Sequence, residues 1–156
     1  MTATIAIAPV RKTIRVNAAA ERTFDVFTSG LSRWWPTNHG IAGKPMKAAV
    51  METRRGGRWY ELSEDGSQTT IGHITVWEPP QRFVMSWEIN SKWKPDATVS
   101  SEVEVRFIPE GADTTRVELE HRNFEQMGAA DGESMRKDVD GGWPKLLELF
   151  KREAER

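Results

Sequence analysis

The sequence predicts an α+β fold in which a curved antiparallel sheet of about seven strands is wrapped around a long C-terminal helix. Apolar and polar residues alternate along successive short segments between residues 10 and 122, which is typical of half-buried strands. The final segment instead spaces its apolar residues as a helix does. Consecutive strands joined by short turns pair antiparallel and need a cover on one face, so we expect the last helix to lie against the sheet.

Length and composition exclude several classes of protein. The 156 residues include 22 Lys and Arg and 23 Asp and Glu, and a net charge of −1 argues against a role with nucleic acid. No apolar run is long enough for membrane insertion, and the absence of cysteine excludes disulfides and thiol catalysis. We expect a cytoplasmic protein with a flexible N-terminal leader over residues 1–9 and a single domain over residues 10–156.

One strand and two short helices are expected first. Val10–Val16 alternates as a strand does. Asn17 is a suitable N-cap for a helix over Ala18–Ser29, whose apolar residues recur with helical spacing. Leu31–Trp35 is expected to form a second short helix that ends before Pro36. Along the sequence, these two helices come between the first strand and the six strands that follow.

The middle of the chain predicts six strands broken by turns rich in Gly, Pro and Asp. The expected strands are Ala48–Arg54, Gly57–Leu62, Thr69–Glu78, Gln81–Ile89, Ser100–Pro109 and Thr114–Arg122. The last two have the most regular alternation, so each should have one buried and one solvated face. A polar loop that carries Trp93 is expected over residues 91–97.

The C-terminal segment predicts the helix that covers the sheet. Its apolar residues step by three and four along one stripe: Met135, Val139, Trp143, Leu146 and Phe150. Pro144 interrupts this pattern, because proline lacks the backbone donor and presses on the preceding turn. We expect a kink there or two helical pieces that meet there.

Tryptophan is the outstanding feature of the composition. The chain has 7 Trp and 1 Tyr, and such a set predicts either a heavy core or an aromatic-lined pocket. If a pocket lies between the sheet and the last helix, the residues expected to line it are Trp35, Trp59, Trp87, Phe124, Trp143 and Leu147.

The titratable residues give few catalytic signals. His39, His73 and His121 are far apart and lack the spacing of metal ligands, so neither a metal nor a cofactor is expected. His121 shares its strand parity with Val117 and therefore faces the covered side. It is either a hydrogen-bonded structural residue or a polar group that binds a ligand or moves a proton.

A charged hairpin offers a second set of polar candidates. Glu52 and Arg54 precede the turn at residues 55–57, and Glu61 follows it. These side chains form either ion pairs on a solvated face or a carboxylate–guanidinium set at a pocket.

Several motifs resemble a known superfamily. Residues 20–27 (AERTFDVF) followed by Trp34-Trp35 resemble the opening of the helix-grip superfamily, also described as START-like, birch-pollen-allergen-like or SRPBCC. Residues 52–59 (ETRRGGRW) and 72–87, which contain Trp-Glu-Pro-Pro, are similar to bacterial homologues of the heat-shock-chaperone ATPase activator. The pattern Thr-x-Val-x-Leu-x-His over residues 115–121 is similar to the same group.

This resemblance implies a fold and several alternative functions. It implies a helix-grip fold with an apolar cavity between the sheet and the long helix. Its name implies activation of a chaperone ATPase in the stress response. Stand-alone members bind or carry small hydrophobic ligands, and some relatives in the superfamily are cyclases, aromatases or hydrolases.

Three functional hypotheses follow. In the first, which we favour, the chain binds a small hydrophobic ligand, aromatic or lipid-like, with His121 and Glu52 as polar anchors. In the second, it is an enzyme that uses the same cavity, with His121 and Glu52 or Glu61 as general acid and base. In the third, it is an interaction module that binds a chaperone or forms a homodimer through Trp34, Trp93 or an edge strand.

Overall fold

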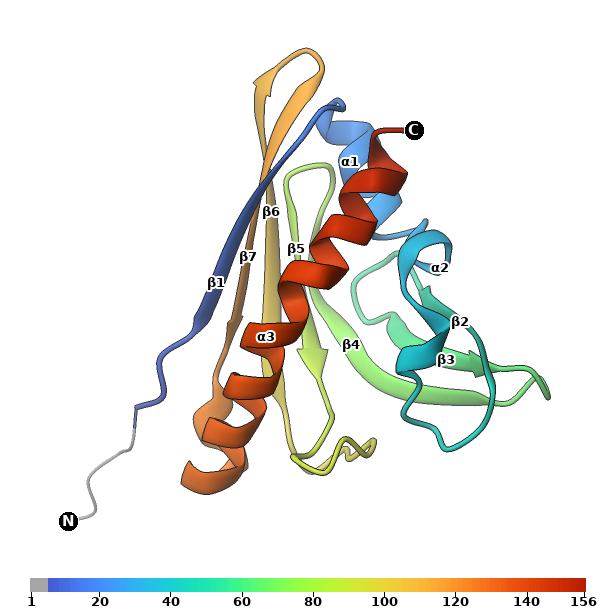
Figure 1. The fold of residues 1–156 in the computed structure, drawn as a ribbon, viewed down its shortest axis with the longest axis vertical. Helices are drawn as coiled ribbons and strands as arrows, with labels where there is room; N and C mark the ends of the chain where they lie inside the picture. Colours follow the sequence, from blue (N-terminus) through green and yellow to red (C-terminus); the bar gives the residue numbers. More distant parts are fainter. Residues whose placement is uncertain (1–5) are drawn as a thin grey trace.

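Seven strands form one antiparallel sheet that curves around the C-terminal helix in the computed structural model, which describes residues 6–156 (Figure 1). The strands are β1 (Val10–Val16), β2 (Met46–Met51), β3 (Arg58–Ser63), β4 (Gln68–Glu78), β5 (Arg82–Trp87), β6 (Ser101–Gly111) and β7 (Thr114–Arg122). The helices are α1 (Ala20–Phe27), α2 (Leu31–Trp34) and α3 (Ala129–Ala154), with short 3-10 turns over Thr37–His39 and Phe124–Met127. The predicted α+β helix-grip fold is confirmed.

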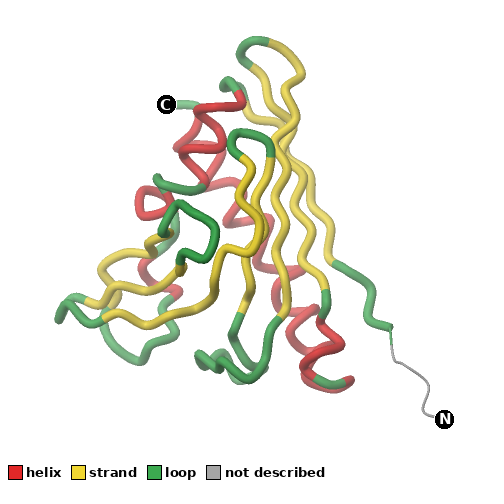
Figure 2. The backbone as a smooth tube through the Cα atoms, turned by 180° about the vertical axis from the view of Figure 1, so that it is seen from behind, coloured by secondary structure: helices red, strands yellow, loops and turns green. Residues whose placement is uncertain are grey.

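The sheet has the strand order β1-β7-β6-β5-β4-β3-β2. Every neighbouring pair beyond β1 is consecutive in sequence, although β5 and β6 are joined by the longer loop over residues 88–100. β4 changes partner along its length: residues 68–73 pair with β3, and residues 74–78 pair with β5. Register shifts occur in both pairings, and such bulges bend a strand. Figure 2 shows β4 leading from the main sheet towards the β2–β3 end.

The concave face of the sheet holds two aromatic clusters. Near α1, five phenylalanines pack against one another, mostly edge to face, with one stacked and one tilted pair: Phe24, Phe27, Phe83, Phe107 and Phe150. Near the other end of the sheet, the aromatic side chains are mostly tryptophans, and they surround the cavity described below. The phenylalanine cluster is fully buried and forms the solid part of the core.

Three local predictions need correction or comment. Asn17 does not cap α1: the N-cap position is Ala19, and the Asn17 backbone N–H donates to the Glu155 carboxylate. Pro144 does not divide the last helix, because α3 is continuous from Ala129 to Ala154. The leader expected over residues 1–9 falls partly on residues 1–5, which lie outside the described residues, whereas Ile7 is buried in the core.

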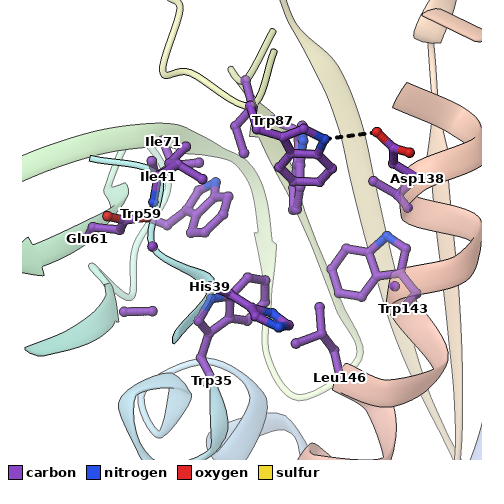
Figure 3. A pocket seen from close by; sticks show the side chains of 16 residues that line it. Trp35, His39, Ile41, Trp59, Glu61, Ile71, Trp87, Asp138, Trp143 and Leu146 are labelled. Atoms are coloured by element: carbon purple, nitrogen blue, oxygen red, sulfur yellow. Dashed lines mark hydrogen bonds between the residues drawn. The ribbon is translucent and has the colours of Figure 1, made fainter. Parts of the chain in front are cut away.

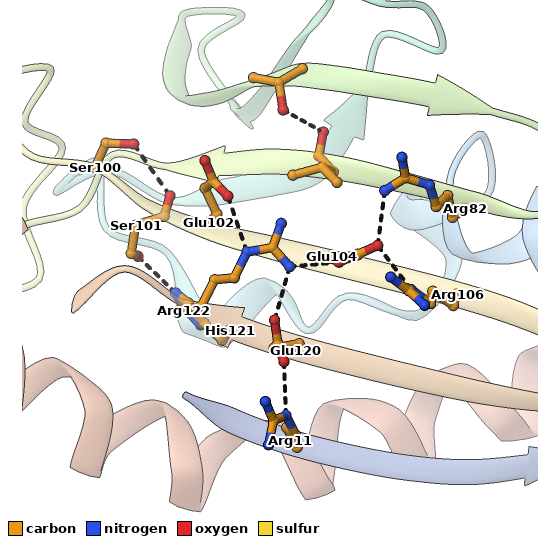
Figure 4. A network of polar contacts seen from close by, with 12 residues as sticks. Arg11, Arg82, Ser100, Ser101, Glu102, Glu104, Arg106, Glu120, His121 and Arg122 are labelled. Atoms are coloured by element: carbon orange, nitrogen blue, oxygen red, sulfur yellow. Dashed lines mark hydrogen bonds and ion pairs between the residues drawn. The ribbon is translucent and has the colours of Figure 1, made fainter. Parts of the chain in front are cut away.

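The convex face of the sheet carries a network of charged side chains (Figure 4). Glu104 on β6 is almost completely covered, because Arg82, Arg106 and Arg122 from three adjacent strands pair with its carboxylate. Burial alone would raise the pKa of Glu104, but the hydrogen bonds from these guanidinium groups outweigh it and lower the pKa to about 2. Glu104 is therefore ionised at neutral pH and joins neighbouring strands.

Gly141 gives a stability prediction for α3. This residue lies inside the helix, and no described atom lies within 4 Å of the position that a Cβ would occupy. Gly141→Ala is expected to raise the free energy of unfolding by about 0.5–1 kcal/mol, because alanine loses less backbone entropy than glycine on helix formation. Urea denaturation followed by circular dichroism measures the change. A variant less stable than the parent would contradict the prediction.

Candidate functional site

A cavity of about 330 Å³ lies between the β2–β5 part of the sheet and α3 (Figure 3). Five tryptophans line it: Trp35, Trp59, Trp87, Trp93 and Trp143. The apolar side chains of Ile41, Ala49, Ile71, Ile89, Val139 and Leu146 complete most of the remaining wall. The cavity is therefore an aromatic chamber with few polar groups.

Four of the tryptophans form a closed ring. The ring centroids of Trp35 and Trp59 are 5.7 Å apart, and those of Trp59 and Trp87 are 5.5 Å apart. Trp143 completes the circle, at 5.7 Å from Trp87 and 6.2 Å from Trp35. These tilted and edge-to-face pairs have the separations that favour aromatic contact.

Trp59 is held by the bend in β4. Its indole Nε1 donates to the Ser86 carbonyl at 2.9 Å, across the backbone of Gly72 on β4. A Cβ at position 72 would clash with both the Ser86 carbonyl oxygen and Trp59 Nε1, so only glycine leaves room for this hydrogen bond. The glycine at position 72 therefore allows the hydrogen bond that fixes Trp59 in the cavity wall.

Trp143 is held by a buried histidine. His121 Nδ1 accepts from Trp143 Nε1 at 3.1 Å, and His121 Nε2 lies 2.7 Å from Ser101 Oγ. Because Nδ1 is an acceptor, the ring proton is on Nε2 and points to Ser101. Burial of the fully enclosed imidazole lowers the pKa of His121 to about 3, so the ring is neutral at physiological pH.

Two carboxylates stand at the cavity from opposite sides (Figure 3). Glu61 on β3 is 5% exposed, and its two oxygens accept from the backbone N–H groups of Ile41 at 2.5 Å and Ala42 at 3.1 Å. Asp138 on α3 accepts from Trp93 Nε1 at 2.9 Å. Trp93 has a backbone φ of 59°, an uncommon conformation for a bulky residue. The two carboxylates therefore fix the loops on either side of the cavity.

Trp87 contributes an unsatisfied donor beside the cavity. Its side chain is 3% exposed, and its Nε1 has no hydrogen-bond partner among residues 6–156. A buried N–H without a partner costs about 1–3 kcal/mol of stability.

The residues predicted from the sequence occupy three places. Trp35, Trp59, Trp87, Trp143 and Glu61 line the cavity. Phe124, Leu147 and His121 are buried outside the lining, and His121 contacts two of the lining residues, Trp87 and Trp143. Glu52 and Arg54 lie in the turn after β2: Glu52 pairs with Arg58, and Arg54 is exposed. Hydrogen bonds from the Arg58 backbone and side chain lower the pKa of Glu52.

Sequence reasoning missed His39, Ile41, Trp93 and Asp138 as cavity residues. The helical stripe contained a signal for Asp138, because residues 138, 142 and 146 step by four beside Val139 and Trp143. Trp93 and the loop over residues 39–41 had no such signal, because irregular loops have no period to extrapolate.

Two further properties of the described chain bear on function. No group of three or more His, Cys, Asp and Glu side chains within residues 6–156 is arranged to hold a metal ion. Across the same residues, no helix has both the length and the apolar composition that a membrane span requires.

Comparison with solved structures finds relatives along almost the whole chain. An anthrahydroquino-γ-pyrone synthase, Txn09, is 38% identical with a TM-score of 0.65, and the match covers 94% of this chain and 97% of that one. The self-sacrificing resistance protein CalC from Micromonospora echinospora is 34% identical with a TM-score of 0.70, and the match covers 94% and 93%. CalU16 from the same organism, at 24% identity and a TM-score of 0.61, shares the fold.

A comparison with curated proteins gives no match. The family model described as Activator of Hsp90 ATPase homolog 1-like protein matches residues 17–155. The motifs at residues 20–27, 52–59 and 72–87 fall inside this match, so the family resemblance that they indicate is confirmed. With that match and relatives at 38% and 34% identity, the chain belongs to the family of Activator of Hsp90 ATPase homolog 1-like proteins.

Proposed function

We propose that this protein binds a small, flat aromatic molecule in the tryptophan-lined cavity. The observation that carries the proposal is the closed ring of Trp35, Trp59, Trp87 and Trp143 around a cavity of about 330 Å³. Ligand pockets generally measure about 300–1,000 Å³ and combine apolar walls with a few polar groups. Indole rings at tilted angles offer both faces and edges to a ligand ring.

The relatives support an aromatic ligand. The name of Txn09 describes the synthesis of an anthrahydroquinone fused to a γ-pyrone, which is a polycyclic aromatic product. CalC is described as a self-sacrificing resistance protein, a description that names no ligand. A shared fold alone does not transfer a function, but both relatives match this chain over nearly its full length at more than a third identity.

Calorimetric titration with 1,4-dihydroxyanthraquinone, a flat three-ring probe, tests the proposal. We expect saturable binding at one site, and we expect Trp35→Ala to weaken it by about tenfold, because the variant removes a ring that faces the ligand. Trp77→Ala is the matched control: Trp77 is also a half-buried tryptophan, but it packs on Phe24 outside the cavity. Equal loss in both variants, or no binding to the parent protein, would overturn the proposal.

Native mass spectrometry of protein purified from its own host complements this titration. A co-purifying small molecule would have a mass consistent with an aromatic compound, and the Trp35→Ala protein would carry less of it. This measurement identifies the ligand, whereas the titration identifies the site.

We also propose catalysis in the same cavity as a second candidate function, because the 38%-identical relative is described as a synthase. The polar side chains at the cavity are His39, Glu61 and Asp138, and these would supply any acid–base step. His121 is unsuited to this step, because it is neutral and both of its ring nitrogens are engaged. Incubation of a bound aromatic precursor with the parent and His39→Ala proteins tests the idea. Unchanged turnover in the variant would exclude His39.

Chaperone binding, a homodimer and a cytoplasmic location stay predictions. An ATPase assay of the chaperone with and without this protein checks the first. Light scattering of the purified protein checks the second, and fractionation of the host cell checks the third.

A further inference from the structure

The carboxylate side chains that line the cavity are negatively charged, and no lining lysine or arginine offsets them within the described residues. Glu61 and Asp138 line the cavity from opposite walls. Lys92 and Lys94 flank Trp93 in sequence, but both side chains are exposed and outside the lining. His39 is the one lining residue among residues 6–156 that could carry a positive charge.

The two carboxylates lack a cationic partner within the part of the chain that the structure describes. Across residues 6–156, neither Glu61 nor Asp138 takes part in an ion pair; both accept only neutral N–H groups. Glu61 is buried, so its charge is poorly screened by solvent. An anionic ligand group would be repelled here, whereas a cationic group would meet a carboxylate that has no cationic partner among the described residues.

The fold does not need the charge of Asp138. The visible role of this side chain is to accept one hydrogen bond from Trp93, and the amide oxygen of asparagine could also accept it. The carboxylate therefore adds a negative charge beyond what the contact requires.

The aromatic walls favour the same charge. The face of an indole ring is electron-rich, and tryptophan is the best partner for a cation placed within about 6 Å of the ring. Trp35, Trp59 and Trp143 lie between the two carboxylates in Figure 3. A flat ligand with a protonated amine would thus place its ring among the indoles and its ammonium group beside one of the two carboxylates.

We propose that the cavity selects an aromatic ligand that carries a protonated amine over neutral and anionic ligands of the same shape. This preference rests on the proposed binding function and specifies its ligand class. It assigns Glu61 and Asp138 as the residues that set the charge of the ligand.

Three naphthalene probes test the preference, because they share one ring system and differ in charge. They are 2-naphthylmethylamine (positive), 2-naphthalenemethanol (neutral) and 2-naphthoate (negative), each titrated calorimetrically at pH 7 and low salt. We expect the amine to bind about tenfold more tightly than the alcohol, and the carboxylate to bind most weakly. Added salt should reduce the advantage of the amine.

Two variants locate the cause. Asp138→Asn keeps the acceptor for Trp93, so it should reduce the amine-to-alcohol affinity ratio by about threefold and leave the affinity for the alcohol unchanged. Glu61→Gln should reduce this ratio further, since its carboxylate is buried. The ratio is the useful quantity, because damage to the loop over residues 41–42 would weaken both probes alike. Asp113→Asn, exposed in the turn between β6 and β7, changes the net charge equally and should leave the ratio unchanged.

The outcomes distinguish a failure of the charge preference from a failure of the proposed function. Equal binding of the amine and the alcohol to the parent protein would overturn the charge preference and leave aromatic binding intact. Asp138→Asn and Glu61→Gln proteins that keep the full parental ratio would also overturn it. Failure of all three naphthalenes and of 1,4-dihydroxyanthraquinone would overturn the proposed function and the preference together.

Discussion

Gly72→Ala is expected to destabilise the protein by about 3 kcal/mol or more, because the position is overpacked by backbone rather than by a movable side chain. An added Cβ would lie far inside van der Waals contact of the Ser86 carbonyl oxygen and 2.5 Å from Trp59 Nε1. Relief would require β4 and β5 to separate, and the bond from Trp59 to Ser86 would break. The substitution therefore damages the sheet and the cavity wall together.

Urea denaturation of the Gly72→Ala protein measures this loss. Gly111→Ala is the control: Gly111 also lies in a strand, but no described atom lies within 4 Å of its missing Cβ. The typical effect of a point mutation on the free energy of unfolding is about 1 kcal/mol. If the free energy of unfolding of the Gly72→Ala protein lies within about 1 kcal/mol of that of the parent, the strands adapt around the methyl group and the prediction is wrong.

Acidification from pH 7 to pH 4 is expected to remove about 3 kcal/mol of stability through His121. Its pKa is about 3 in the fold, because of burial, and near 6.5 in the unfolded chain. Between these two values the unfolded chain binds a proton that the folded chain does not. The free energy of unfolding therefore falls as the pH falls, and below pH 3 the contribution is lost entirely.

The window from pH 7 to pH 5 separates the contribution of His121 from that of Glu104. Glu104, whose pKa falls from 4.5 to about 2 on folding, adds its own loss only as the pH drops below 4.5. Within the window we expect His121 to account for about 2 kcal/mol. His121→Gln offers Trp143 an acceptor and Ser101 a donor but stays neutral at every pH. Urea titrations of both proteins should show this pH dependence in the parent and its absence in the variant; equal slopes would contradict the assignment.

Periodic segments were the predictable part of the fold. β7 spans Thr114–Arg122 as expected, because its strict alternation has one solution in which the apolar face is buried. The stripe from Met135 to Phe150 likewise placed α3 against the sheet. Asn17 failed as a cap because the preference for Asn is local, whereas its backbone N–H donates to Glu155 at the far end of the chain.

The site was only partly predictable, because the pattern along a strand gives the direction of a side chain but not its partners. The alternation of side chains along β7 correctly predicted that His121 points into the core. It could not show that Ser101 and Trp143 form hydrogen bonds with both of its ring nitrogens. Glu61 and Glu52 looked alike in the sequence. They separate because β2 ends at Met51, which leaves Glu52 in the turn beside Arg58, whereas Glu61 lies within β3 and faces the cavity.

The ring of four indoles also has an optical consequence. Chromophores whose centres lie 5.5–6.2 Å apart in a fixed, asymmetric arrangement couple their electronic transitions and give near-ultraviolet circular dichroism only while the packing is intact. A molecule that entered the ring would perturb all four transitions at once and, if it absorbed at longer wavelength, would quench their emission. The circular dichroism and emission of these tryptophans therefore report whether the cavity is occupied. Libraries of unlabelled compounds can be screened by measuring these signals directly.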